Sequence, residues 1–77
     1  MRLKLKKYLR VLRSDPDHDA VLHETGNRLP PGVVLDVLPG HFSKEFDGQF
    51  LKAVLVTQAD VLASSKYVLM DELDAAI

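Results

Sequence analysis

The first thirteen residues alternate between apolar and polar side chains. At the two-residue period of a strand, the apolar residues share one side: Met1, Leu3, Leu5, Leu9 and Val11. Only Lys7 breaks this side, and the other side is polar apart from Tyr8. The pattern predicts a half-buried strand with one face in water. An amphipathic helix is the alternative, because Leu5, Tyr8, Leu9 and Leu12 also gather on one stripe at a helical period.

Turn signals and short apolar runs fill the next part of the chain. Ser14 to Asp19 holds three acidic residues around Pro16, which predicts a loop. Ala20 to His23 is a short strand candidate, and Glu24 to Asn27 contains Gly26 and predicts a turn.

A second strand region begins after a pair of prolines. Leu29-Pro30-Pro31-Gly32 fits a type II turn, because proline sets φ ahead of a glycine that supplies a positive φ. Val33 to Leu38 follows with three β-branched residues and predicts a strand. Its Val33, Leu35 and Val37 face one way, and Asp36 marks the opposite side as exposed to water.

Asp47-Gly48 is the strongest local signal. Asp-Gly between strand formers predicts a hairpin with a two-residue type I′ turn, which pairs His41–Phe46 with Gln49–Thr57. Phe50 to Val56 is apolar apart from Lys52, so this strand is expected to be central and covered on both faces. The spacing of the three phenylalanines around the hairpin, Phe42, Phe46 and Phe50, places them in the core.

The last part of the chain predicts one strand and one short helix. Lys66 to Met70 is the strand candidate, and Asp71 to Ile77 places Leu73 and Ile77 four residues apart, as on one face of a helix. The alternative is a single helix that begins at Ser65 and runs through Ile77.

Short strands at regular spacing, separated by Gly, Pro and Asp turns, indicate a mainly β domain. The order of long loop, Pro-Pro-Gly turn, strand, tight hairpin, strand and final short helix resembles the layout of an SH3-like barrel. We therefore expect residues 1–77 to form a single small domain, a five-stranded SH3-like barrel with a short C-terminal helical turn. An α+β fold with an N- or C-terminal helix is the alternative.

Composition narrows the class of protein. Of the 77 residues, 47% are hydrophobic and 27% are charged, as in ordinary globular domains, and none is cysteine. Disulfides and thiolate metal sites are therefore excluded. The apolar runs are far shorter than the ~20 residues of a membrane span, and the N-terminus lacks the apolar segment of a secretory signal. We expect a cytoplasmic protein that does not enter a membrane.

The net charge of −1 hides a strong asymmetry. Residues 1–13 contain six of the ten basic residues and no acid, and the other 64 residues hold all eleven acids. This split predicts a basic face for a polyanion or for an acidic surface on a neighbour. The candidate binding residues are Arg2, Lys4, Lys6, Lys7, Arg10 and Arg13.

Motifs for catalysis and metal binding are weak. Asp15, Asp17 and Asp19 have the spacing that opens a calcium loop, but Ala20 and Gly26 occupy the positions that need Gly and Glu. His18 and His23 lie near these carboxylates without a nearby third histidine. No serine has the context of an activated nucleophile. We expect no catalytic residues, metal or cofactor, and no enzymatic activity.

Two functions fit these observations. The first is a small protein-interaction or accessory module that associates with another protein or with itself, as a homodimer or larger oligomer. The second is nucleic-acid binding, in which the basic N-terminal strand contacts phosphates. Tyr8 is the one aromatic residue among these basic side chains, which is less than a stacking platform for bases requires.

Overall fold

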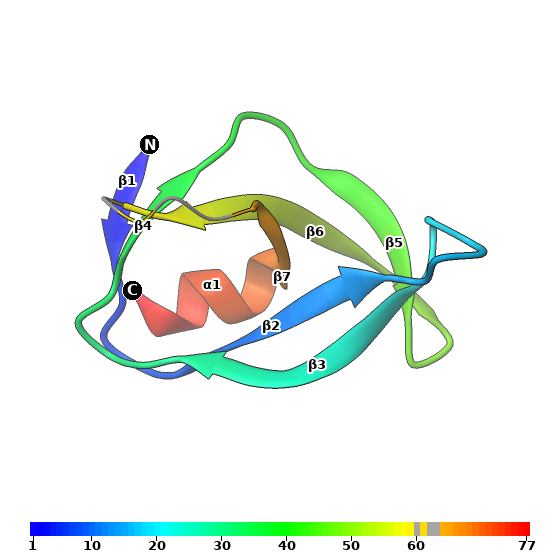
Figure 1. The fold of residues 1–77 in the computed structure, drawn as a ribbon, viewed down its shortest axis with the longest axis horizontal. Helices are drawn as coiled ribbons and strands as arrows, with labels where there is room; N and C mark the ends of the chain where they lie inside the picture. Colours follow the sequence, from blue (N-terminus) through cyan, green and yellow to red (C-terminus); the bar gives the residue numbers. More distant parts are fainter. Residues whose placement is uncertain (60, 62–63) are drawn as a thin grey trace.

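The computed structural model describes residues 1–59, 61 and 64–77. Within these ranges the chain is mainly β, with a seven-stranded antiparallel sheet and one short helix (Figure 1). The elements are β1 (Arg2–Lys4), β2 (Leu9–Ser14), β3 (Leu22–Leu29), β4 (Val34–Val37), β5 (Phe42–Phe46), β6 (Gln49–Gln58), β7 (Lys66–Leu69) and α1 (Met70–Ala76).

The sheet is open. Its strands pair in the order β1-β4-β6-β7-β2-β3, and β5 pairs with the first half of β6. Among the described residues, β1 and β3 have no ladder between them, so the expected closed barrel of five strands is not found. A single parallel bridge between Val21 and Glu45 joins the chain before β3 to β5.

The predicted N-terminal strand is two strands separated by a bend, which is one reason that the count of five was too low. The bend lies at Lys6 and Lys7, where the alternation is broken. There the backbone N–H groups of Lys6 and Lys7 donate to the carbonyl oxygen of Ala76, at 2.6 and 3.3 Å. The bend therefore satisfies a carbonyl at the C-terminal end of α1 that has no partner inside the helix. The alternative of an N-terminal helix is wrong.

The turn predicted at Glu24–Asn27 is also wrong, because these residues lie inside β3. The register with β2 shifts between Arg10 and Leu12, and Thr25, Gly26 and Asn27 bulge from the ladder. The hydroxyl of Thr25 donates to the carbonyl oxygen of Val11 at 2.8 Å, and Gly26 has a φ of 82°. The glycine signal therefore marks a β-bulge, which a residue with positive φ permits.

The other turns agree with their predictions. Asp47 and Gly48 have φ values of 51° and 78°, as both central residues of a type I′ turn require. In the Pro-Pro-Gly turn, the N–H of Val33 donates to the carbonyl oxygen of Pro30, and Gly32 has a φ of 94°. The predicted strand and helix near the C-terminus are confirmed as β7 and α1, so the longer helix from Ser65 is wrong.

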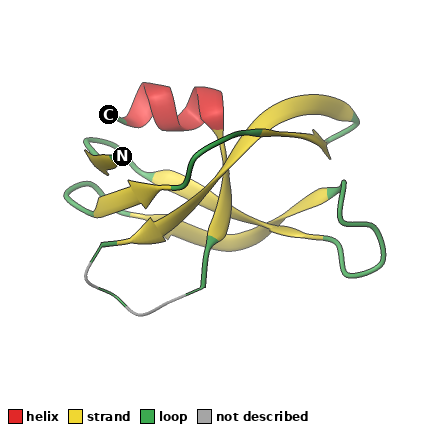
Figure 2. Ribbon diagram, turned by 90° about the horizontal axis from the view of Figure 1, so that it is seen from above, coloured by secondary structure: helices red, strands yellow, loops and turns green. Residues whose placement is uncertain are grey.

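Two groups of buried side chains lie on opposite faces of β6. We name the group that includes α1 the helix-side core, and the other the hairpin-side core. The helix-side core consists of Leu5, Leu9, Leu35, Val54, Val56, Val68, Leu73 and Ala76. The hairpin-side core consists of Leu12, Leu22, Phe46, Ala53 and Leu69. Figure 2 shows α1 against one side of the sheet.

The aromatic residues of the hairpin divide between core and surface. Phe46 is buried as expected, but Phe50 is 71% exposed and Phe42 is 40% exposed, so their predicted burial is wrong. Phe50 lies at the start of β6, where alternation places it opposite the hairpin-side core. Coverage on both faces of β6 is found at the middle of the strand, where Ala53 and Val54 are both buried. No described helix is long and apolar enough to cross a membrane.

Candidate interaction surfaces

The six predicted basic residues are spread over the molecule. Arg2 lies on β1 and binds the carboxylate of Asp36 on β4 through two hydrogen bonds, of 2.9 and 3.2 Å. These bonds lower the pKa of Asp36. Arg13 lies at the far end of β2, in register with His23. The N-terminal basic residues therefore do not form one continuous patch.

Arg10 is enclosed by partners from three elements. Its guanidinium binds both carboxylate oxygens of Glu72 on α1, the shortest contact being 2.8 Å, and Glu24 on β3 at 2.9 Å. Its other contact is the ring of Phe46, whose centroid lies 4.6 Å from the guanidinium carbon. Hydrogen bonds to Glu72 and then Glu24 raise the pKa of Arg10. The geometry makes Arg10 a clamp between the helix and the sheet.

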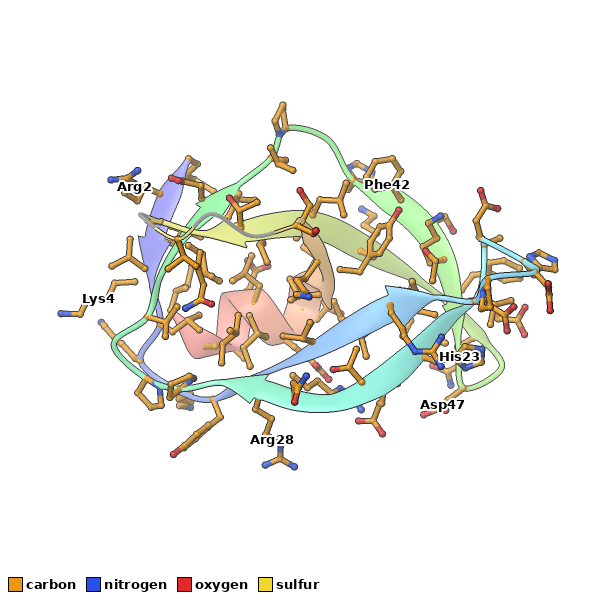
Figure 3. All side chains as sticks on the ribbon, viewed as in Figure 1. Arg2, Lys4, His23, Arg28, Phe42 and Asp47 are labelled. Carbon is orange, nitrogen blue, oxygen red and sulfur yellow. The ribbon has the colours of Figure 1, made fainter. Side chains whose placement is uncertain are left out.

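Basic side chains gather at the bend between β1 and β2. Lys4, Lys6 and Lys7 are exposed there, and none makes an ion pair with another described residue. Arg28 on β3 is also exposed and forms no ion pair with another described residue. We name these four residues the basic end; Figure 3 shows Lys4 and Arg28 pointing away from the sheet.

A cleft lies between the basic end and the last turn of α1. Its volume is about 390 Å³, and it is lined by three cations, two carboxylates, one aromatic ring and two alanines: Lys7, Arg10, Arg28, Glu24, Glu72, Tyr8, Ala75 and Ala76. Tyr8 is 65% exposed, so its ring borders the cleft without being held in the core. The cleft therefore combines two unpaired cations with an exposed aromatic ring.

Acidic side chains gather at the other end of the long axis. The loop between β2 and β3 and the hairpin turn at Asp47 both lie at the right of Figure 1, away from the bend between β1 and β2. Asp17, Asp19 and Asp47 are exposed there, and the part of the chain that is described offers them no ion-pair partner. We name these three residues the acidic end.

The loop of the acidic end is held by its own hydrogen bonds. The carboxylate of Asp15 binds the Nε2 atom of His23 at 2.7 Å and accepts the backbone N–H of Asp17 at 2.8 Å. These two contacts lower the pKa of Asp15. Backbone bonds from Asp15 to Val21 and from Val21 to His18 close the loop at its base. Asp17 and Asp19 are therefore presented on an ordered segment.

The residues considered for metal binding do not converge. Within residues 1–59, 61 and 64–77, no three His or acidic side chains lie close enough to share an ion. His18 is exposed, and Asp15 is turned toward His23.

Sequence reasoning missed Arg28 and the acids that bind Arg10. Arg28 falls between the turn predicted at Glu24–Asn27 and the Pro-Pro-Gly turn, and the sequence pattern assigned it to no element. Glu24 and Glu72 are far from Arg10 in the sequence, and no local pattern connects them. The spacing of Tyr8 between Lys6 and Arg10 did indicate an exposed aromatic residue among cations.

A separate hollow of about 610 Å³ lies beside the start of α1. It is lined mainly by apolar side chains, among them Met1, Val37, Leu38 and Met70. Met1 is 78% exposed at its edge. This hollow has none of the charged groups of the two ends.

No known protein family, curated protein or solved structure matches this chain.

Proposed function

We propose that this protein is a small, non-enzymatic interaction module that associates with another protein surface and with itself. The observation that carries the proposal is the separation of unpaired charge: the bend between β1 and β2, with its lysines, lies at the opposite end of the long axis from the acidic end, and Arg28 lies between them (Figures 1 and 3). A single copy cannot bring these two ends together, so their attraction can be satisfied only between molecules.

Exposed charge of this kind sets orientation and association rate more than affinity. Lys4, Lys6 and Lys7 keep their long side chains in water, and each contact that they form is screened by salt. Self-association through the ends should therefore be weak, and it should weaken further as salt is added.

Size-exclusion chromatography with light scattering tests this proposal. At high micromolar protein and about 50 mM salt, the mean mass should exceed that of the monomer, and about 500 mM salt should return it toward the monomer. A mass that stays monomeric in both buffers would remove the self-association part of the proposal.

Nucleic-acid binding is the second candidate function, and Tyr8 favours it. An exposed aromatic ring beside Lys7 and Arg28 is the combination on which a single-stranded base stacks. Two observations weigh against this function: Arg2 and Arg10 are held by carboxylates, and Arg13 lies toward the acidic end.

Fluorescence anisotropy with single- and double-stranded oligonucleotides at about 50 mM salt separates the two candidate functions. Dissociation constants weaker than about 100 µM would leave only the protein-interaction reading.

We also propose that the strand arrangement is an SH3-like layout in which the two end strands of the sheet, β1 and β3, are not paired with each other. The bridge between Val21 and Glu45, which joins β5 to the chain before β3, supports this proposal.

A further inference from the structure

We infer that the cleft between Lys7, Tyr8 and Arg28 receives the Asp17–Asp19 segment of a second copy of this chain, so that copies associate head to tail. The inference rests on the proposed function and assigns the two surfaces that meet. The binding chemistry is that of an acidic peptide segment held between an ammonium and a guanidinium group.

The cleft fits carboxylates because its unpaired groups are cations. Glu24 and Glu72 also line the cleft and both bind Arg10, so the charge of Arg10 is more than balanced, and the net positive charge of the cleft comes from Lys7 and Arg28. Lys7 and Arg28 line the same cleft, and neither forms an ion pair with a described residue. The guanidinium of Arg28 can bind one carboxylate through two hydrogen bonds, and Lys7 can bind another as a point charge.

The acidic segment is suited to enter the cleft because it is exposed and already ordered. The hydrogen bonds of Asp15 to His23 and to Asp17 hold the start of the loop, and Pro16 restricts its backbone. Ordering a flexible loop would oppose association, so a preformed loop loses less entropy when it binds. Asp17 and Asp19 then offer two carboxylates, one for each cation of the cleft.

A second copy of this chain is a better partner for these two ends than a surface that carries charge of one sign only. Each copy carries one basic end and one acidic end, and its net charge is only −1, so charge does not accumulate as copies join. The two surfaces are different parts of the molecule, so the contact is heterologous. Repeated contacts of this kind produce a ring or an open chain.

A charge exchange tests the pairing. One variant carries Lys7→Glu with Arg28→Glu, and the other carries Asp17→Lys with Asp19→Lys. In each variant the cleft and the loop carry like charges at the substituted positions, so each variant should associate about tenfold more weakly than the wild type at about 50 mM salt. An equimolar mixture of the two should recover association, because the cleft of the second variant meets the loop of the first.

Lys52→Glu with Lys66→Glu is the matched control. It lowers the net charge as much as Lys7→Glu with Arg28→Glu does, but at two exposed lysines of β6 and β7 outside the cleft. It should therefore leave association at the wild-type level. Circular dichroism of every variant checks that the fold is kept, as expected for exposed positions.

Light scattering gives distinguishable outcomes. Association of the mixture, together with weak association of each variant by itself, supports the pairing of cleft and loop. If the wild type associates and the exchange variants associate equally well, other surfaces meet: this inference is overturned and the proposed function stands. If the variants are monomeric and their mixture is too, the two surfaces do not meet each other. If the wild type is monomeric, self-association itself fails.

Discussion

The two cores on either face of β6 differ in size and in what covers them. The helix-side core draws on β2, β4, β6, β7 and α1 and on Leu5 in the bend, and α1 covers it with Leu73 and Ala76. The hairpin-side core is smaller, and its margin is formed by the partly buried Leu51 and Tyr67. Near this margin, Lys44 lies over the rings of Phe42 and Tyr67, 5.8 and 5.2 Å from their centroids. One strand thus contributes to a larger core covered by a helix and to a smaller core bordered by aromatic rings.

The largest expected effect distinguishes these cores directly. Leu35→Ala removes a side chain that is fully buried in the helix-side core, and it should lower the free energy of unfolding by about 4 kcal/mol. Leu22→Ala in the hairpin-side core should cost about 2–3 kcal/mol, because this smaller core has fewer buried side chains that lose contacts with the removed atoms. Urea denaturation of both variants measures the difference. A larger loss for Leu22→Ala would show that the hairpin-side core is the more rigid of the two.

The second prediction concerns the contact that joins the two cores. Arg10→Met removes the guanidinium that lies over Phe46 of the hairpin-side core and binds Glu72 of α1, leaving Glu72 and Glu24 without their cation. The free energy of unfolding should fall by about 1–3 kcal/mol, the range for hydrogen bonds to charged groups. Arg13→Met on the same strand is the control and should change it by less than about 0.5 kcal/mol. Equal losses in thermal melts would contradict the clamp.

A third prediction compares ion pairs on the two sides of the molecule. The pKa values of Asp36 and Asp15 are lowered in the folded state, so the unfolded chain binds more protons as the pH falls. Their contribution is present above the ordinary carboxyl pKa of about 4 and is lost as the pH falls through the lowered values. The melting temperature should therefore drop on acidification below about pH 4. Asp36→Asn should make that drop shallower, and an unchanged slope would contradict the role of Asp36.

The smallest expected effects lie on β6 itself. Leu55 is half-buried and belongs to neither core, so Leu55→Ala should cost about 1–2 kcal/mol, less than full burial would predict. Phe50→Ala removes a ring that is mostly in water and should change the free energy of unfolding by less than about 0.5 kcal/mol. Chemical denaturation of the two variants tests whether the burial of a side chain, rather than its hydrophobicity, determines how much the free energy of unfolding falls. A loss for Phe50→Ala as large as that for Leu55→Ala would mean that Phe50 is covered in solution.

Local signals predicted the elements whose conformation is fixed by a few neighbouring residues. Asp47-Gly48 specified the hairpin, and Pro31-Gly32 specified the turn before β4. Alternation along β6 assigned Val54 and Val56 to one face and Ala53 to the other, as the two cores confirm. These features depend on backbone geometry and on the side-chain period, and a few neighbouring residues determine both.

Features that depend on distant partners could not be predicted in this way. Gly26 signals a positive φ, but only its pairing with β2 decides whether the result is a turn or a bulge. The bend at Lys7 follows from the position of Ala76, and Phe50 is exposed because nothing covers its end of β6. The sequence identified the basic residues, but it could not show that Arg2 and Arg10 are paired, because their partners come from three other elements.

The bond between the Lys6 N–H and the Ala76 carbonyl also bears on folding kinetics. It connects residues near the two ends of the 77-residue chain, and the helix-side core likewise requires Leu5 and Leu73 together. Helix α1 has only seven residues, too few to be stable alone, so it must wait for the bend to form. Such non-local closure is typical of β domains that fold in milliseconds to seconds. In refolding experiments, we expect α1 to gain its hydrogen-exchange protection together with the N-terminal bend and not before it.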